Sequence, residues 1–409
     1  MKSLPIKELI TEIITGEWGI DAIKDKGVAV IRTANFLNSG QIDFSKIVRR
    51  EIDKKKVSKK KLFSGDIIIE KSGGSPIQPV GRVVLFKNPD KDTYLCNNFT
   101  SVLRPNRDIV FPEYLFYALH YNHKKGKTLR YQNKTTGIIN LKLDKYLSSE
   151  IHIPPLDDQI RIATLLSKVE CLISRRREQL KKLDELLKSI FLEMFGDPVR
   201  NENGWDKKPI GSFADVGTGG TPSRKKLSDY YDGNIFWVKT TEVKNAEIYC
   251  TKETITATAL SETNCRIYPP NTILLAMYGQ GKTRGQVGYL KVNAATNQAC
   301  AAILPSLHNQ IFIYEQLKYL YKSIRSLARG GNQENLNLNI VRNIALILPS
   351  KNLQNQFADI VEMVEGIKSL YKQSLAELEN LYGTLSQKAF TGELDLSRLP
   401  LVKEIVPGI

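Results

Sequence analysis

The 409-residue chain has little of the chemistry that most enzymes depend on. Its five cysteines stand apart and none has the C-x-x-C spacing of a zinc or redox site, so we expect reduced thiols in a cytoplasm. Four histidines leave little material for acid–base or zinc catalysis. No apolar run approaches the ~20 residues that span a bilayer, and the first residues lack the apolar core of a signal peptide. We therefore expect a soluble, cytoplasmic protein.

The sequence also lacks the loops that bind nucleotide cofactors. YGQGKTRG (278–285) does not have the G-x-x-x-x-G-K-S/T spacing of a phosphate loop, and no G-x-G-x-x-G follows a strand and opens a helix. An amino-group DNA methyltransferase would need an Asn/Asp-Pro-Pro-Tyr/Phe loop, whereas the chain has YPPN (268–271) and IPPL (153–156). We expect neither a cofactor nor a bound metal.

Positive charge is what the chain has in excess. Lys and Arg number 59 against 43 Asp and Glu, which gives a formal net charge of +16. Such an excess on an otherwise average composition indicates a polyanionic partner, most often nucleic acid. Basic residues cluster at 49–50, 54–56 and 59–61, where they could either neutralise phosphates or form a solvated loop.

Two long helices are the clearest structural signal. Between Asp157 and Met194 there is no proline or glycine, and apolar residues recur at alternating steps of three and four, interrupted only at Arg176, which predicts a coiled-coil helix. Its apolar positions are Leu166, Val169, Ile173, Leu180, Leu183, Leu187, Ile190 and Met194. A second helix of this kind is expected from about Leu353 to Phe390.

The chain contains the same unit twice. IHIPPLDDQI (151–160) matches LILPSKNLQNQF (346–357), with Gln159 aligned to Gln356, and INLKL (139–143) matches LNLNI (336–340). Each copy is a globular segment followed by a long helix, and this repetition decides the architecture.

The expected fold class is α+β, because short apolar runs bounded by Gly, Pro and Asn are typical of mixed or antiparallel sheet. Two globular α/β domains would be joined by the two long helices. Antiparallel pairing of these helices as a coiled coil would bury both apolar stripes. It would also give the duplicated chain a pseudo-two-fold symmetry that matches the DNA duplex.

Gly-rich polar loops occur in both copies, at 71–79 and 130–137 and again at 217–226, 278–285 and 328–335. They combine backbone that can approach closely with side chains that contact phosphates and read base edges. In the first copy we expect DNA contacts at Arg32, Asn35, Lys71, Ser75, Gln78, Arg130, Gln132 and Lys134. In the second copy we expect them at Thr221, Ser223, Arg224, Lys225, Lys239, Gln280, Lys282, Arg284, Arg329 and Asn332.

A metal-dependent nuclease is the weaker alternative. Asp232 followed by Glu242-x-Lys244 loosely fits a D…E-x-K metal-binding pattern, but the first copy has no counterpart. His120 and His123 are three residues apart without a cysteine or carboxylate cluster, so we interpret them as helix residues rather than metal ligands.

Three segments give the whole chain a specific resemblance to the specificity (S) subunit of type I restriction-modification systems. IHIPPLDDQIRIA (151–163) with its heptad helix is similar to the family's first conserved region, and QKAFTGEL (387–394) is similar to its C-terminal signature. GGTPSRKKLSDYYDGNIFWVKTTEV (219–243) is similar to a segment common in the family's target recognition domains. LPSKNLQNQ replaces the usual double proline before the second helix, and the segment from TANFLNSGQIDF (33–44) onward is a less familiar type of recognition domain.

The resemblance implies a non-catalytic subunit that reads a bipartite DNA site. Target recognition domains would span 1–152 and 198–348, conserved long helices 153–197 and 349–394, and a tail 395–409. The helices would act as a ruler across the gap between two half-sites. Two methyltransferase (M) subunits would dock on this scaffold and methylate adenine, and restriction (R) subunits would join them. An S subunit of a related system, whose methylase and nuclease are fused in one partner, is the alternative.

Overall fold

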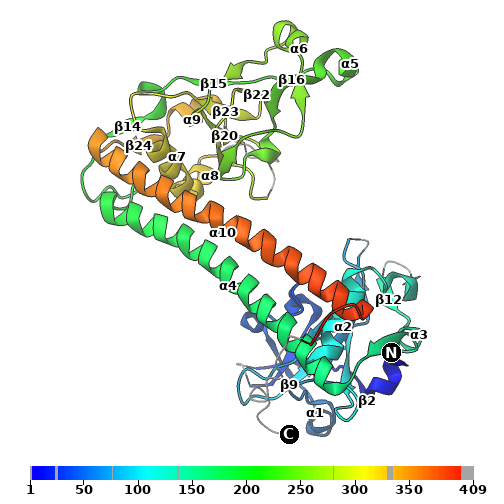
Figure 1. Cartoon of the computed structure of the whole chain (residues 1–409). Helices are drawn as coiled ribbons and strands as arrows, with labels where there is room; N and C mark the ends of the chain where they lie inside the picture. Colours follow the sequence, from blue (N-terminus) through cyan, green and yellow to red (C-terminus); the bar gives the residue numbers. More distant parts are fainter. Residues whose placement is uncertain are drawn as a thin grey trace. The chain divides into compact units, whose positions relative to one another are not determined.

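The computed structural model describes residues 2–23, 26–75, 77–135, 138–279, 281–328 and 335–397, apart from the side chains of Lys134 and Thr135. The chain divides into two compact units, each of which mixes sheets and helices (Figure 1). Within the described residues, unit 1 holds those up to Arg177 and those from Ser374, and unit 2 holds Glu178–Gln373. No helix in the described ranges has the length and hydropathy of a membrane span.

Both expected long helices are present, as α4 (Leu156–Phe195) and α10 (Lys351–Thr391). Each helix is one continuous element that begins in one unit and ends in the other. α4 follows a double proline, and both helices end at a glycine in the left-handed region, Gly196 at φ 74° and Gly392 at φ 80°. A glycine there adopts the backbone angle that closes a helix without steric cost.

The described residues of unit 1 form four sheets. The main sheet has the order β2-β10-β6-β8, formed by Ile10–Thr15, Thr100–Pro105, Ile67–Glu70 and Val83–Leu85. A second sheet has the order β3-β5-β4-β9, formed by Ile20–Asp21, Val48–Glu51, Val28–Ile31 and Tyr94–Cys96. A third has the order β11-β12-β7, formed by Gln132–Thr135, Ile138–Leu141 and Ser72–Gly74. The fourth pairs β1 (Lys2–Pro5) with β13 (Glu150–Ile153).

Unit 2 contains three sheets. The main sheet has the order β15-β23-β20-β21-β17, formed by Val216–Thr218, Cys300–Ile303, Ile273–Ala276, Val287–Leu290 and Ala246–Ile248. A second has the order β18-β16-β22-β19, formed by Thr254–Ile255, Tyr231–Val238, Ala294–Thr296 and Ile267–Tyr268. The third pairs β14 (Lys207–Pro209) with β24 (Ala345–Ile347).

Shorter helices complete the two units. Unit 1 has α1 (Lys54–Lys60), α2 (Pro112–Lys124) and α3 (Leu143–Leu147). Unit 2 has α5 (Leu227–Tyr230), α6 (Ala257–Glu262), α7 (Gln310–Tyr319), α8 (Tyr321–Ser326) and α9 (Leu338–Arg342).

The sheet orders confirm that the fold is duplicated. β2-β10-β6-β8 of unit 1 and β15-β23-β20-β21 of unit 2 are both antiparallel throughout. In each unit a strand of the second sheet has one antiparallel and one parallel neighbour: β4 lies between β5 and β9, and β16 lies between β18 and β22. Sequence repetition and strand topology therefore describe the same repeat.

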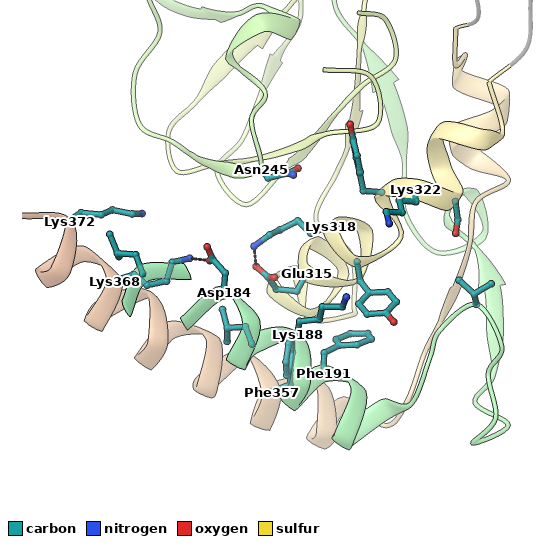
Figure 2. A pocket seen from close by; sticks show the side chains of 16 residues that line it. Asp184, Lys188, Phe191, Asn245, Glu315, Lys318, Lys322, Phe357, Lys368 and Lys372 are labelled. Atoms are coloured by element: carbon teal, nitrogen blue, oxygen red, sulfur yellow. Dashed lines mark hydrogen bonds and ion pairs between the residues drawn. The ribbon is translucent and has the colours of Figure 1, made fainter. Parts of the chain in front are cut away.

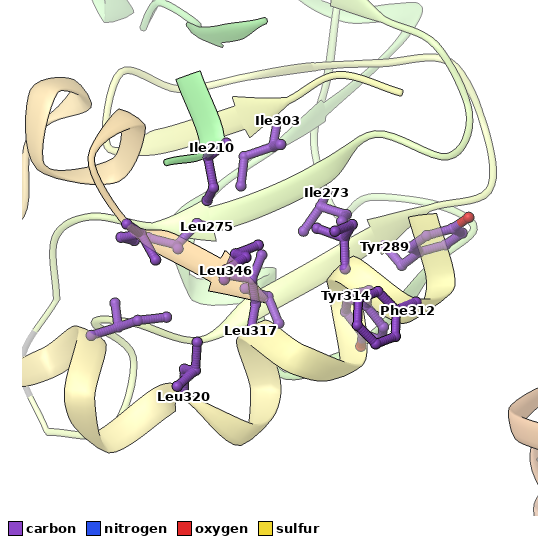
Figure 3. Close-up of a cluster of buried hydrophobic side chains, with 14 of the residues drawn as sticks. Ile210, Ile273, Leu275, Tyr289, Ile303, Phe312, Tyr314, Leu317, Leu320 and Leu346 are labelled. Atoms are coloured by element: carbon purple, nitrogen blue, oxygen red, sulfur yellow. The ribbon is translucent and has the colours of Figure 1, made fainter. Parts of the chain in front are cut away.

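A buried core joins the main sheet of each unit to the long helices. In unit 2 the side chains of β20, β21, α7 and β24 meet in one cluster (Figure 3), which also includes Phe191 of α4 and Phe357 of α10. In unit 1 the corresponding cluster includes Leu166 of α4 and Ala389 of α10. Strands β6 and β20 are wholly buried, as the apolar runs III at 67–69 and ILLA at 273–276 indicate.

Within each unit α4 and α10 run antiparallel. In unit 1 Glu170 accepts a hydrogen bond from Tyr382 at 3.0 Å, and Arg177, further along α4, pairs with Glu379 at 2.5 Å. In unit 2 the Phe191 and Phe357 rings lie 5.5 Å apart. Later residues of α4 thus meet earlier residues of α10 in both units.

One detail of the sequence alignment is wrong. Gln159 is buried, accepts a hydrogen bond from the Phe111 backbone N–H at 2.8 Å and donates to the Pro154 carbonyl at 2.9 Å. Its equivalent is Gln354, which accepts from the Asn309 N–H and donates to the Pro349 carbonyl in the same way. Gln356, which the sequence match favoured, is exposed.

Candidate nucleic-acid interface

In unit 1 the structure brings together the two polar loops that the sequence singled out. The loop at 71–79 begins in β7, which pairs with β12, and β12 pairs with β11. The Ser72 hydroxyl and the Asn140 side chain are 2.6 Å apart across β7 and β12. Lys71, Arg130 and Gln132 therefore lie on or beside one three-stranded sheet, although up to 61 residues of chain separate them (132 minus 71).

The tip of the 71–79 loop is a tight turn. The Ser75 N–H donates to the Gln78 carbonyl at 2.8 Å, and the Gln78 N–H donates to the Ser75 hydroxyl oxygen at 3.0 Å. Both side chains are exposed. Just beyond them, His123 at the end of α2 donates through Nε2 to the Pro79 carbonyl at 3.2 Å. The turn thus holds Ser75 and Gln78 toward solvent.

Asn35 does not fit the expected DNA contact and is withdrawn from the candidate set. Its side chain is 0% exposed. Its Oδ1 accepts from the Arg32 N–H at 2.9 Å, and its Nδ2 donates to the carbonyls of Asp43 and Lys46 at 3.1 and 3.2 Å. Because no atom of this amide is left for a base, its role is to shape the turn after β4. Arg32 itself is half-buried and donates to the Lys46 carbonyl at 3.1 Å.

The basic stretch from Arg49 to Lys61 is partly neutralised within the unit. Arg50 pairs with Asp21 and its guanidinium lies 3.8 Å from the centre of the Trp18 ring. Lys56 and Lys60 on α1 pair with Glu17 at 3.4 and 2.9 Å, and the hydrogen bond from Lys60 holds the pKa of Glu17 below its usual value. Burial is the main reason that the pKa of Lys71 lies below its usual value.

In unit 2 two of the expected cations share one carboxylate. Glu253 accepts from Lys239 and, at 2.5 Å, from Arg224. The hydrogen bond from Lys239 is the main reason that the pKa of Glu253 lies below its usual value. The Arg224 guanidinium also lies 4.2 Å from the centre of the Tyr231 ring. A phosphate approaching Arg224 or Lys239 therefore competes with Glu253.

The other expected contacts of this glycine-rich segment lie at its surface. Thr221 donates to Gln298, which follows β22, and Ser223 accepts from the Lys225 N–H at 3.3 Å. Thr221, Ser223 and Lys225 are all exposed. The segment is anchored by Trp237, whose indole N–H donates to the Gly220 carbonyl at 3.1 Å.

The loop at 278–285 is held by α8. Tyr321 donates through its hydroxyl to the Lys282 carbonyl at 2.6 Å, and Arg325 donates to the Arg284 carbonyl at 2.9 Å. Gly285 closes the loop at φ 84°, with the side chain of Arg325 close to where a Cβ would lie. The Lys282 side chain is exposed and that of Arg284 is half-buried.

Four expected contacts cannot be placed. Gln280, Arg329 and Asn332 lie outside the described residues, and so does the side chain of Lys134.

Sequence reasoning missed the residues that hold these loops. His123 in the last turn of α2 and Tyr321 just after α7 stand at the end of the same helix of the repeat, and each donates to a carbonyl of the corresponding loop. Arg32 and Lys239 are also equivalent. Arg32 follows β4 and Lys239 follows β16, and each precedes a short 3-10 turn. The Arg32 N–H donates to the Asn35 side chain, and the Lys239 N–H donates to the Glu242 side chain. Comparison of the copies around these positions was the signal that could have found them.

The geometry gives no support to the nuclease alternative. Both oxygens of Glu242 accept backbone hydrogen bonds, from Lys239 N–H at 3.0 Å and Lys252 N–H at 2.9 Å, and the residue forms the turn as Asn35 does in unit 1. In the part of the chain that the structure describes, no three His, Cys, Asp or Glu side chains are grouped to hold a metal. His120 is buried, and burial lowers its pKa to about 4.

Each unit also has a cleft between the long helices and the end of a domain helix. In unit 1 the cleft is about 820 Å³ and lies beside Tyr121 and Lys124 at the end of α2. Its wall includes Glu170, which accepts hydrogen bonds from Tyr117 at 2.9 Å and Tyr382 at 3.0 Å. Burial raises the pKa of this carboxyl.

The cleft of unit 2 is about 740 Å³ and occupies the equivalent place (Figure 2). Tyr319 and Lys322 of unit 2 stand 198 positions after Tyr121 and Lys124 (319 minus 121, and 322 minus 124). Its chemistry is different, because more lysines line it: Lys188, Lys318, Lys368 and Lys372 in addition to Lys322. Figure 2 shows Lys368 bonded to Asp184, at 2.7 Å, and Lys318 bonded to Glu315, also at 2.7 Å.

A basic, duplicated α+β fold with polar loops in corresponding places is compatible with a nucleic-acid-binding protein. The chain belongs to the family described as type I restriction modification DNA specificity domain, whose model matches residues 2–183 and again 202–380. It is a specificity subunit of a type I restriction-modification system.

Its relatives bear that name. The type I restriction enzyme MjaIX specificity subunit of Methanocaldococcus jannaschii is 25% identical over 345 residues, which is 78% of this chain and 77% of the relative. The HindI specificity subunit of Haemophilus influenzae is 22% identical over 444 residues, covering 88% and 94%. These names support the prediction that the chain is the specificity part of an enzyme complex and not its catalyst.

Solved structures share the fold. The S subunit from M. genitalium superposes with a TM-score of 0.58 at 17% identity and covers 95% of this chain and 96% of its own. A chain from a structure that addresses complex assembly and conformational transition of the type I R-M system gives 0.52 at 18% identity, covering 96% and 98%.

Proposed function

We propose that this chain reads a bipartite DNA site, with one recognition domain for each half. The observation that carries the proposal is the duplication itself. The 71–79 loop follows β6 in unit 1, and the 278–285 loop follows the equivalent strand, β20, in unit 2. Domains at 1–152 and 198–348 would each contact one half-site, since a repeated protein fold suits two binding elements on one duplex. The exposed candidates Ser75, Gln78, Thr221, Lys225 and Lys282 are the first to test.

The conserved helices, 153–197 and 349–394, would set the gap between the half-sites. α4 and α10 are continuous over 40 and 41 residues and connect the two units, so their length bears directly on that gap. Removal of one heptad from each helix shortens it by ~10 Å, which corresponds to about three base pairs. We expect the recognised gap to change by that amount, and an active variant with an unchanged gap would contradict the ruler.

Partner subunits complete the proposed complex. Two methyltransferase subunits that methylate adenine would attach to the scaffold, and restriction subunits would join them. The occurrence of a cleft at the equivalent place in both units supports attachment of two copies of one partner. A tagged chain should recover a methyltransferase, and the mass of that partner separates a free M subunit from a fused methylase-nuclease.

A map of methylated adenines in host DNA, with and without this gene, tests the proposed function. Loss of methylation at a single bipartite motif is the expected result, and the motif reveals both half-sites together. Exchange of residues 198–348 for the recognition domain of another S subunit should then change one half-site and leave the other unchanged. An unchanged methylation map on deletion, in cells that express the gene, would contradict the proposal.

A further inference from the structure

Ile77 is an apolar side chain at the tip of a polar loop. It is 97% exposed, whereas Val80, three residues later, is completely buried. The other exposed apolar residues of unit 1 are better covered: Ile20 and Ile23 are 67% and 70% exposed, and Phe99 and Ile138 are 42% and 48% exposed. The chain therefore presents almost the whole of this isoleucine to solvent.

The loop holds Ile77 in a defined position. It lies inside the turn that Ser75 and Gln78 close with hydrogen bonds of 2.8 and 3.1 Å between their backbones. Immediately after the turn, the Pro79 carbonyl accepts from His123 at 3.2 Å. Gly81, at φ 95°, packs against Thr128, where a Cβ would meet the threonine side chain at 3.0 Å. Backbone anchored on both sides presents the side chain with little loss of freedom on binding.

The surroundings of Ile77 are those of a base-reading surface. Ser75 and Gln78 on either side are exposed hydrogen-bonding groups, and Gln132 and Arg130 belong to the same sheet region. A protein-docking patch needs a contiguous apolar area of several hundred Å², which one isoleucine among polar residues does not provide. On the major-groove edge of DNA the apolar feature is the C5-methyl group of thymine.

We infer that Ile77 contacts the C5-methyl group of a thymine in the half-site read by unit 1 and so helps to specify that base. The inference rests on the proposed function and adds a specificity-determining residue to it. Gln78 and Ser75 would supply hydrogen bonds to neighbouring groups, while Ile77 distinguishes a methylated pyrimidine from cytosine or uracil at one position.

The test uses duplexes that carry the bipartite motif found by methylation mapping. The full chain, together with its methyltransferase partner, is titrated with duplexes in which each thymine of the unit 1 half-site is replaced in turn by deoxyuridine. Loss of one buried methyl group corresponds to about a fourfold weaker Kd. Wild type should show this loss at one thymine, and Ile77→Ala should bind the thymine and deoxyuridine duplexes there equally.

The control is Leu307→Ala. Leu307 is 92% exposed in unit 2 and lies outside the polar loops, so its truncation should leave every Kd unchanged. If Ile77→Ala keeps the wild-type preference for thymine at every position, the inference is overturned. If Ile77→Ala weakens binding but wild type is indifferent to every deoxyuridine, the thymine contact is overturned in favour of an apolar wedge between bases. Failure of wild type to bind the mapped motif would overturn the proposed function and this inference with it.

Discussion

Replacement of Gln354 by alanine should destabilise unit 2 strongly. The side chain is 0% exposed and joins the start of α10 to the start of α7. Its Oε1 accepts from the Asn309 N–H at 2.9 Å, and its Nε2 donates to the Pro349 carbonyl at 2.8 Å and contacts His308 Nδ1 at 3.3 Å. Alanine leaves all three partners without the amide, in a place that water reaches poorly.

The expected loss follows from these contacts. Three hydrogen bonds at about 1 kcal/mol each give about 3 kcal/mol, and the space vacated by the amide adds to that loss. Because Gln159 makes the same contacts in unit 1, Gln159→Ala should cost a similar amount. Values of this size are a large share of a domain's stability of ~5–15 kcal/mol.

Gln356→Ala is a matched control in the same helix. Gln356 is exposed two residues after Gln354, so its truncation should change the unfolding free energy by less than about 0.5 kcal/mol. Urea unfolding can be followed by tryptophan fluorescence, since Trp205 and Trp237 both belong to unit 2. Equal effects of the two substitutions, or a loss below about 1 kcal/mol for Gln354→Ala, would refute the equivalence of Gln354 with Gln159.

Three further substitutions test the interface and the clefts. Glu253→Gln should free Arg224 and Lys239 and so raise the affinity for non-specific DNA. In a salt titration of DNA binding, the slope of log K against log salt should become steeper by about one. The control Glu185→Gln on α4 should leave that slope unchanged. Tyr321→Phe removes the donor to the 278–285 loop, a hydrogen bond worth about 1 kcal/mol, and should weaken specific DNA binding by up to about fivefold. A wild-type Kd would contradict this role. Burial raises the pKa of Glu170 in the folded chain, so stability should fall as pH rises above the unfolded carboxyl pKa of about 4.3. In thermal unfolding between pH 4 and 8, Glu170→Gln should flatten that fall. A variant profile parallel to the wild-type profile would show that another group titrates.

The long helices and the duplication could be predicted because their signals are local or repeated. A heptad pattern free of proline and glycine determines a helix by itself, and α4 and α10 begin and end within a few residues of the expected bounds. The alignment error at Gln356 arose because two nearby glutamines compete. Further along the two helices, Leu180 aligns with Leu375 at an offset of 195 positions (375 minus 180), and the same offset applied to Gln159 leads to Gln354.

The candidate interface could be predicted only in part, because loops are brought together by strand pairing over long distances in sequence. Pairing of β7 with β12 places the 71–79 loop beside strands β11 and β12. No local sequence pattern specifies the register of that pairing. The burial of Asn35 could not be read from the segment, since an asparagine that shapes a turn and one that reads a base have the same sequence signature. Glu242 forms the corresponding turn in unit 2. Comparison of Asn35 with Glu242 would have argued against a DNA contact for Asn35 and against a metal-binding role for Glu242.

The two clefts show what duplication preserved and what it changed. Their places in the fold are the same, yet the lysine-lined wall of unit 2 replaces a wall where Glu170 accepts from tyrosine hydroxyls. If two copies of one partner bound at these clefts, they would meet the same residue types at the shared positions, Tyr121 with Tyr319 and Lys124 with Lys322. Contacts there would give equal binding at both ends of the duplicated chain. Contacts with the divergent walls would instead make one end bind more tightly and respond differently to salt.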